Sequence, residues 1–101
     1  MKRLDPEARK EQILNVAVEL AELLGYDKIR RDGIAEKANV ADGLVTRYFN
    51  TMNQLKRAVM RHAVTNDNVI IVAQGIAARD PQALKAPDAL RQKALAHLAR
   101  G

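Results

Sequence analysis

Apolar residues recur along the chain at steps of three and four positions, which is the spacing of one face of an α-helix. Asp5 is a suitable N-cap, Pro6 suits the first helical position, and Gly25 can end a helix in the left-handed conformation. The pattern therefore predicts a first helix over residues 6–24. Its apolar stripe consists of Ile13, Ala17, Leu20 and Leu24.

Two short helices are predicted next, over residues 31–38 and 42–48. Asn39 lies between them and tolerates the left-handed conformation better than any residue except glycine. Asp42 can cap the second of the two helices. A sharp turn between the two helices is therefore expected at Asn39.

A long fourth helix should begin after Thr51, which with Gln54 has the form of a capping box. Its expected buried stripe is Leu55, Val59 and Ala63. The polar "TNDN" at 65–68 predicts a break before a fifth helix in "VIIVAQGIAA", and "RDP" and "KAPD" bracket a last amphipathic helix. In that last helix, the residues expected to pack are Leu90, Ala94, Leu95 and Leu98. The predicted fold class is all-α.

Two short helices joined by a tight turn, the second polar on its outer side, describe a helix-turn-helix, whose second helix enters the DNA major groove. Val45 and Phe49 lie four positions apart and should hold this second helix against the domain. The side chains left facing outward are Leu44, Thr46, Arg47 and Tyr48. An arginine can grip guanine with two hydrogen bonds, and leucine or threonine methyl groups can touch a thymine methyl.

Composition and charge are consistent with this prediction. A chain of 101 residues with 48% hydrophobic and 29% charged positions is long enough for one domain with a modest core. Residues 28–61 carry eight Lys or Arg against three Asp or Glu, a local surplus of +5. Positive charge concentrated around the predicted helix-turn-helix points to a polyanion partner, with a solvated basic face as the alternative.

Several other function classes find little support. Cysteine is absent, which removes disulfides, thiol catalysis and cysteine metal sites. There is no Gly-rich phosphate loop, and His62 and His97 are far apart without acidic partners at metal-ligand spacing. We therefore expect no enzyme activity, no cofactor and no metal. The longest apolar run has ten residues and the start of the chain lacks an apolar segment, so we expect a cytoplasmic protein without membrane span or signal peptide.

The residues carry a resemblance to the DNA-binding domain of TetR-family transcriptional regulators over about residues 9–62. Four blocks in the same order and spacing carry it: "ILNVAVELAELLGYDKI", "GIAEKANV", "DGLVTRYF" and "NTMNQLKRAV". The resemblance implies DNA contacts from the start of the second helix, from the third helix and from the start of the fourth. These candidate site residues are Arg30, Arg31, Asp42, Gly43, Leu44, Thr46, Arg47, Tyr48, Met52 and Lys56.

Four positions depart from the family's pattern. Arg30 and Ala41 stand where the family prefers capping Thr or Ser, Thr46 stands where Tyr is usual, and Met52 replaces a usual Lys. We predict a DNA-binding region over residues 1–66 and a short helical dimerisation region over residues 67–101, together one compact domain.

The resemblance also implies a long ligand-binding and dimerisation domain after the DNA-binding domain. Residues 67–101 supply only one or two helices, too few to enclose a cavity of ~300 Å³ or more, so we expect no small-molecule ligand. They can form a homodimer: the β-branched residues 69–72 offer apolar surface, and four small residues allow close approach of backbones. These are Ala73, Gly75, Ala77 and Ala78. Alternatively, this segment packs wholly inside the monomer.

The sequence thus predicts a transcriptional regulator, a repressor that binds a near-palindromic operator as a homodimer. One alternative is a protein-interaction module or antirepressor that keeps the helix-turn-helix shape without binding DNA. Another is that the chain is the DNA-binding fragment of a longer inducible regulator.

Overall fold

The structure is a computed structural model that describes residues 5–101, all of whose regular elements are α-helices. Residues 1–4, which belong to the predicted DNA-binding region, lie outside the described residues. In chain order the helices are α1 (Pro6–Leu24), α2 (Arg31–Ala38), α3 (Asp42–Phe49), α4 (Met52–Thr65), α5 (Val69–Ala77), α6 (Pro81–Leu84) and α7 (Asp88–Arg100). The prediction of an all-α fold is confirmed.

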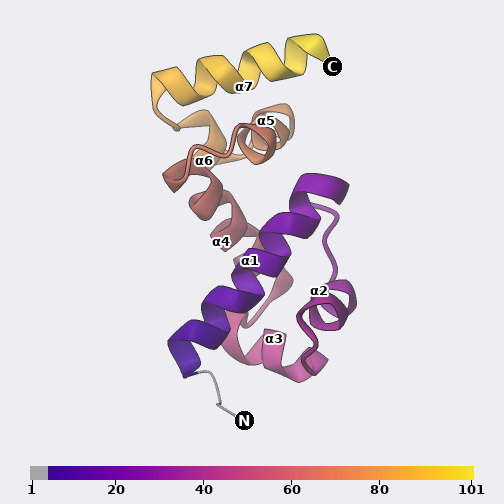
Figure 1. Ribbon diagram of the computed structural model, residues 1–101. Helices are drawn as coiled ribbons and strands as arrows, with labels where there is room; N and C mark the ends of the chain where they lie inside the picture. Colours follow the sequence, from indigo (N-terminus) through magenta and orange to yellow (C-terminus); the bar gives the residue numbers. More distant parts are fainter. Residues whose placement is uncertain (1–4) are drawn as a thin grey trace.

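The molecule is elongated, with extents of 45 × 21 × 21 Å. In Figure 1, α3 lies at one end beside the start of α1, with α2 next to it, and α5, α6 and α7 lie at the other end. Helix α4 joins the two ends, because it packs on α1 and α3 and also on α5 and α6. None of the helices within residues 5–101 is long and apolar enough to cross a membrane.

The first two predicted helices have the expected bounds. The Asp5 carboxylate caps α1 by accepting a hydrogen bond from the Ala8 N–H at 2.8 Å. Asn39 ends α2 in the left-handed conformation, with φ 58° and ψ 49°. Gly25 has the predicted positive φ of 103°, but its ψ of 136° lies outside the left-handed helical region, so that part of the prediction is wrong.

Two local predictions near α3 and α4 need correction. Ala41, and not Asp42, is the N-cap of α3, and Asp42 is the first helical residue. Only half of the capping box forms: the Thr51 hydroxyl accepts from the Gln54 N–H at 3.1 Å, while the Thr51 N–H donates to the Phe49 carbonyl. That backbone bond closes the tight turn between α3 and α4 and occupies the donor that the Gln54 side chain was expected to meet.

One continuous hydrophobic core runs the length of the molecule. The predicted stripe of α4, Leu55, Val59 and Ala63, is completely buried, and Met60 beside it is buried as well. Burial of each larger aliphatic side chain contributes about 1.5–3 kcal/mol. Because the same face of α4 contacts both ends, the core makes α1 to α4 continuous with the C-terminal helices.

Helix α5 packs inside the monomer, which is the alternative to its predicted use as a dimer surface. Ile71, Val72 and Ala73 are buried, and Gly75 lies against Met60 of α4 and Ala83 of α6. The small residues at 73 and 75 therefore allow helices of the same chain to approach one another closely, and they do not serve contact between two chains. Of the four small residues, Ala77 and Ala78 are exposed.

The last two helices differ from the single helix expected. A short helix, α6, was missed; the Asp80 carboxylate caps it by accepting from the N–H groups of Gln82 and Ala83. In α7, Leu90 and Ala94 are buried against the core as predicted. Leu95 and Leu98, which were also expected to pack, are 53% and 38% exposed, so they do not pack within the chain.

A polar cluster fastens the end of α1 to the C-terminal helices. Gln74 of α5 donates to the Ala21 carbonyl at 2.9 Å and accepts from the Tyr26 N–H at 2.8 Å. The Tyr26 hydroxyl donates to the Asp80 carboxylate at 3.3 Å. Burial, together with the negative charge of Asp80, raises the pKa of Tyr26 to about 12. The phenol therefore keeps its proton, and its hydrogen bond, throughout the neutral range.

We predict that Gly75→Ala destabilises the fold by ~1–3 kcal/mol, because overpacking forces a buried core to shift. A Cβ at this position would lie 2.5 Å from both the Ala83 Cβ and the Met60 Cε. Gly33→Ala is the matched control: its Cβ would meet nothing within 4 Å, and the change should stabilise the fold by ~0.4–1 kcal/mol. Urea unfolding of both variants measures the difference. Equal stability of Gly75→Ala and the wild type would contradict the close packing of α5.

Candidate nucleic-acid interface

The turn between α2 and α3 is built from backbone hydrogen bonds around Asn39. The Asn39 N–H donates to the Glu36 carbonyl at 3.2 Å, and the Val40 N–H donates to the Ala35 carbonyl at 3.0 Å. Asn39 can adopt the positive φ that this requires because its short polar side chain tolerates it. The turn sets α3 against α2 as the second helix of a helix-turn-helix.

The inner face of α3 is as predicted. Val45 and Phe49 are buried at 2% and 7% exposure, so they hold the helix against the domain. On the outer side, Arg47 is exposed, as are Asp42 and Gly43. Gly43 has open space where a Cβ would be, so a partner can approach the backbone closely at this point.

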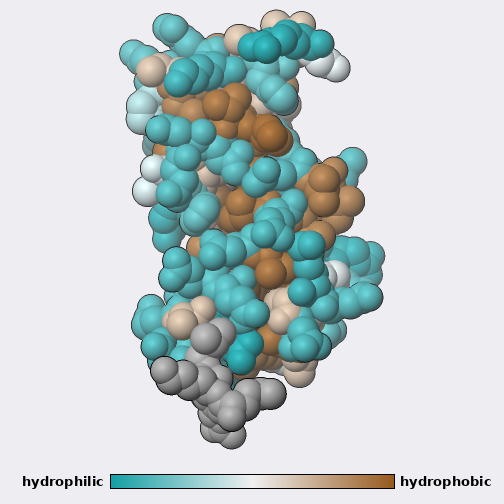
Figure 2. Space-filling view, in the orientation of Figure 1, coloured by the Kyte–Doolittle hydropathy of each residue, from teal (hydrophilic) through white to brown (hydrophobic). Residues whose placement is uncertain are grey.

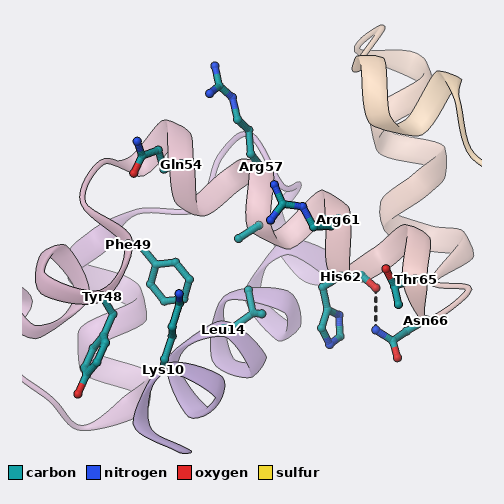
Figure 3. A pocket seen from close by; sticks show the side chains of 11 residues that line it. Lys10, Leu14, Tyr48, Phe49, Gln54, Arg57, Arg61, His62, Thr65 and Asn66 are labelled. Atoms are coloured by element: carbon teal, nitrogen blue, oxygen red, sulfur yellow. Dashed lines mark hydrogen bonds between the residues drawn. The ribbon is translucent and has the colours of Figure 1, made fainter. Parts of the chain in front are cut away.

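The remaining residues predicted on the outer side of α3 are less exposed to solvent than their spacing predicts. Leu44, Thr46 and Tyr48 are half-buried, and Leu44 and Tyr48 pack against the core. The hydroxyl of Tyr48 points away from α4 in Figure 3. Tyr48 therefore combines a packed ring with a free polar end.

The N-terminal ends of α2, α3 and α4 converge on one surface hollow of about 530 Å³. Five of the ten candidate site residues line it: Arg30, Arg31, Asp42, Met52 and Lys56. Two further lining residues, Ile29 and Asp32, were missed by the sequence reasoning. Asp32 could have been found from its position two residues after Arg30, because this spacing lets its carboxylate reach the Arg30 guanidinium.

Two of these helix ends lack a capping side chain. The N-caps of α2 and α3 are Arg30 and Ala41, and neither side chain bonds a first-turn N–H; by contrast, Thr51 caps α4. Uncapped first-turn N–H groups and the positive end of the helix dipole both favour an anion at these ends. The N-cap side chains of α2 and α3 therefore leave first-turn donors uncapped on the surface that carries the basic side chains, apart from the Gly33 N–H, which bonds the Asp32 carboxylate.

The hollow also contains its own negative charge. The Arg30 Nε donates to the Asp32 carboxylate at 3.3 Å, with both side chains largely exposed. This hydrogen bond, with one from the Gly33 N–H, lowers the pKa of Asp32 below its usual value. Within residues 5–101, Arg31 and Lys56 form no ion pair, so their charges are available to a partner. No group of His, Asp or Glu that could hold a metal occurs in the same part of the chain.

Comparison with known proteins relates this geometry to a family. Residues 13–59 match the bacterial regulatory proteins of the tetR family. The match covers 47 of the 101 residues, so the helix-turn-helix region of the chain resembles that of the tetR family. The matched segment runs from the middle of α1 into α4 and contains all ten candidate site residues. No curated protein and no solved structure gives a significant match to the chain.

The match to the tetR family supports a general activity. It supports DNA binding by the helix-turn-helix of α2 and α3, and a transcriptional regulator of the tetR type. The members of this family are regulators and not enzymes.

Proposed function

We propose that this chain is a transcriptional repressor that binds a near-palindromic operator as a homodimer. The observation that carries the proposal is the convergence of three helix N-termini, with Arg31 and Lys56, beside the exposed face of α3. Phosphate contacts position a protein on DNA, whereas contacts to base edges select the sequence. The hollow has the charge for the first role, and α3 has an exposed Arg47 for the second.

Each candidate residue has a role that fits its surroundings. Arg47 contacts a guanine, and the half-buried Leu44 and Thr46 contact bases through the parts of their methyl groups that remain accessible. Asp42 and Gly43 bring the start of α3 close to the duplex. The remaining candidates contact the sugar-phosphate backbone; these are Arg30, Arg31, Tyr48, Met52 and Lys56.

The dimer interface in this proposal lies on α7 and not on the small residues of α5. Leu95 and Leu98 stand three positions apart on one side of α7 and are exposed. Figure 2 has hydrophobic surface near α5 and α7, and a second patch over the end of α1, where Leu23 and Leu24 are exposed. Helix α7 lies at the opposite end of the molecule from α3 (Figure 1). Pairing there leaves both α3 helices free to contact one duplex, as two-fold symmetry requires.

Repression follows if the operator overlaps a promoter, because a bound dimer then blocks polymerase. Such a regulator works in the cytoplasm at the nucleoid. The proposal uses residues 67–101 for pairing and needs no ligand cavity among α5, α6 and α7. Selecting bound sites from a random DNA pool tests it: enrichment of an inverted repeat with half-sites about 34 Å apart, or a multiple of that, is expected. A chain that retains no DNA would instead favour the protein-interaction module.

Arg47→Ala should cost ~1–3 kcal/mol per half-site on the selected operator, because it removes a bidentate base contact, and far less on random DNA. Arg100→Ala, on exposed surface at the other end of the molecule, is the control of equal charge change. Gel-shift titrations give the ratio of wild-type to variant affinity on the operator and on random DNA. Equal losses on operator and random DNA would exclude base readout by Arg47.

The salt dependence of binding tests the phosphate contacts. A dimer that neutralises about six to eight phosphates gives a slope of log affinity against log salt of roughly −5 to −7. Arg31→Ala removes one contact per half-site, so the slope should become shallower by about two units while the preferred sequence stays the same. Lys93→Ala on α7 is the matched control. An affinity that hardly changes with salt would mean that the basic residues are a solvated face.

Leu95→Asp should convert the dimer to monomers, since it buries a carboxylate in an apolar interface. The Leu95 side chain is 53% exposed in the single chain, so the substitution should leave the fold of the monomer unaffected. Leu23→Asp is the control, because Leu23 is 78% exposed at the end of α1. Sedimentation equilibrium measures both. Dissociation by Leu23→Asp alone would move the interface to the end of α1.

A further inference from the structure

A groove of about 630 Å³ runs between α1 and α4 and ends at the last turn of α3. Lys10 and Leu14 line it from α1, Phe49 from α3, and Arg57, Arg61 and His62 from α4 (Figure 3). The residues that line this groove and those that line the hollow at the helix N-termini are entirely different. The groove is thus a second surface feature of the DNA-binding region, on the other side of α4.

The charge of the groove has one sign. Lys10, Arg57 and Arg61 contribute three exposed cations, and its lining contains no carboxylate. Within residues 5–101, none of the three cations forms an ion pair. Like charges gathered along one groove raise the local concentration of anions and repel one another until an anion binds. Such a groove is chemically suited to a negatively charged group.

The walls of the groove also offer apolar contact. The Phe49 ring forms part of the wall, and the Lys10 ammonium lies 5.6 Å from its centroid, a cation–π contact. Leu14 and Ala58 add partly buried aliphatic surface. His62 lies near the other end, where its Nδ1 is buried without a hydrogen-bond partner among the described residues. The groove therefore combines cations, an aromatic surface and one unmet polar atom.

We propose that this groove binds a small organic anion, in which a carboxylate, phosphate or sulfonate is carried on an aromatic or alkyl body. Its volume lies within the ~300–1,000 Å³ of small-molecule sites, and those sites combine apolar walls with a few charged groups. Arg57 and Arg61 bind the anionic head, and the body packs against Leu14, the half-buried Tyr48 and the small part of Phe49 that remains exposed. A DNA backbone would use the charges but would leave the aromatic surface unfilled.

Occupancy of the groove is coupled to DNA binding, a step that rests on the proposed function. Phe49 and Tyr48 line the groove and belong to α3, which carries Arg47. A bound anion adds negative charge beside this helix and so weakens its attraction to phosphates. DNA then weakens anion binding by the same factor, because coupling between two sites is reciprocal.

The binding test is an NMR titration of the ¹⁵N-labelled full chain, without DNA, with naphthalene-2-carboxylate. The amides of Lys10, Leu14, Phe49 and Arg61 should shift together, giving one saturable isotherm. The neutral isostere 2-naphthylmethanol and inorganic phosphate should each bind about tenfold more weakly, since each lacks one half of the recognition. Arg61→Gln should lower the affinity for the carboxylate about tenfold. Arg100→Gln, the matched control, should leave it unchanged.

Three results would overturn the site. The neutral alcohol binding as tightly as the carboxylate would mean apolar contact alone. An unchanged affinity in Arg61→Gln would remove the cationic head site. Shifts centred on Arg31 and Lys56 would mean that the anion occupies the hollow at the helix N-termini instead.

Filter binding of random genomic DNA, with and without saturating naphthalene-2-carboxylate, tests the coupling. At a carboxylate concentration that just saturates the wild type, retention should fall for the wild type and fall less for Arg61→Gln, whose site is then only partly filled. If the titration identifies the groove but retention is the same with and without the carboxylate, the coupling is wrong and the site stands. A chain that retains no DNA under either condition contradicts the proposed function, while the NMR titration still decides the site.

Discussion

The structure depends on the burial of one face of α4. Leu55, Val59, Met60 and Ala63 are completely buried, and the helix that carries them packs against α1 and α3 at one end and α5 and α6 at the other. The area that they remove from water is the main favourable contribution to joining the two ends. Apart from the end of α1, helices α1 to α3 have few contacts with α5 and α7. The position of the helix-turn-helix relative to the C-terminal helices is therefore set by α4.

The buried face also determines what the other sides of α4 can do. One side presents Met52 and Lys56 to the hollow at the helix N-termini, and another presents Arg57 and Arg61 to the groove along α1. The same helix therefore supplies basic side chains to two separate surfaces.

Packing around Gly75 explains why α5 is not an exposed dimer surface. A close approach of α5 to Met60 and Ala83 lets Ile71 and Val72 reach the core, so the apolar residues of this segment are consumed within one chain. The polar cluster of Gln74, Tyr26 and Asp80 then fixes the segment to α1 through hydrogen bonds that are partly shielded from water. What remains exposed and apolar at this end lies mainly on α6 and α7.

The sequence by itself determined the helix-turn-helix and every described helix except α6. Local rules suffice for these: the Asp5 cap, the left-handed Asn39, and the spacing of Val45 and Phe49 act within a few residues and are visible in the order of amino acids. The candidate site residues of α2, α3 and α4 were also identified from the sequence, and five of them line one hollow.

Only the tertiary structure decided which apolar and small residues face a neighbour within the chain. The small residues Ala73 and Gly75 look the same in the sequence whether they pack against another helix of the chain or against a second copy. Leu90 and Leu95 belong to the same amphipathic pattern, although Leu90 is buried and Leu95 is exposed. The groove between α1 and α4 was likewise invisible, because Lys10 and Arg61 are fifty-one positions apart and meet only when α1 packs on α4. Helical periodicity gives the apolar side of a helix, but the choice of its partner depends on long-range packing.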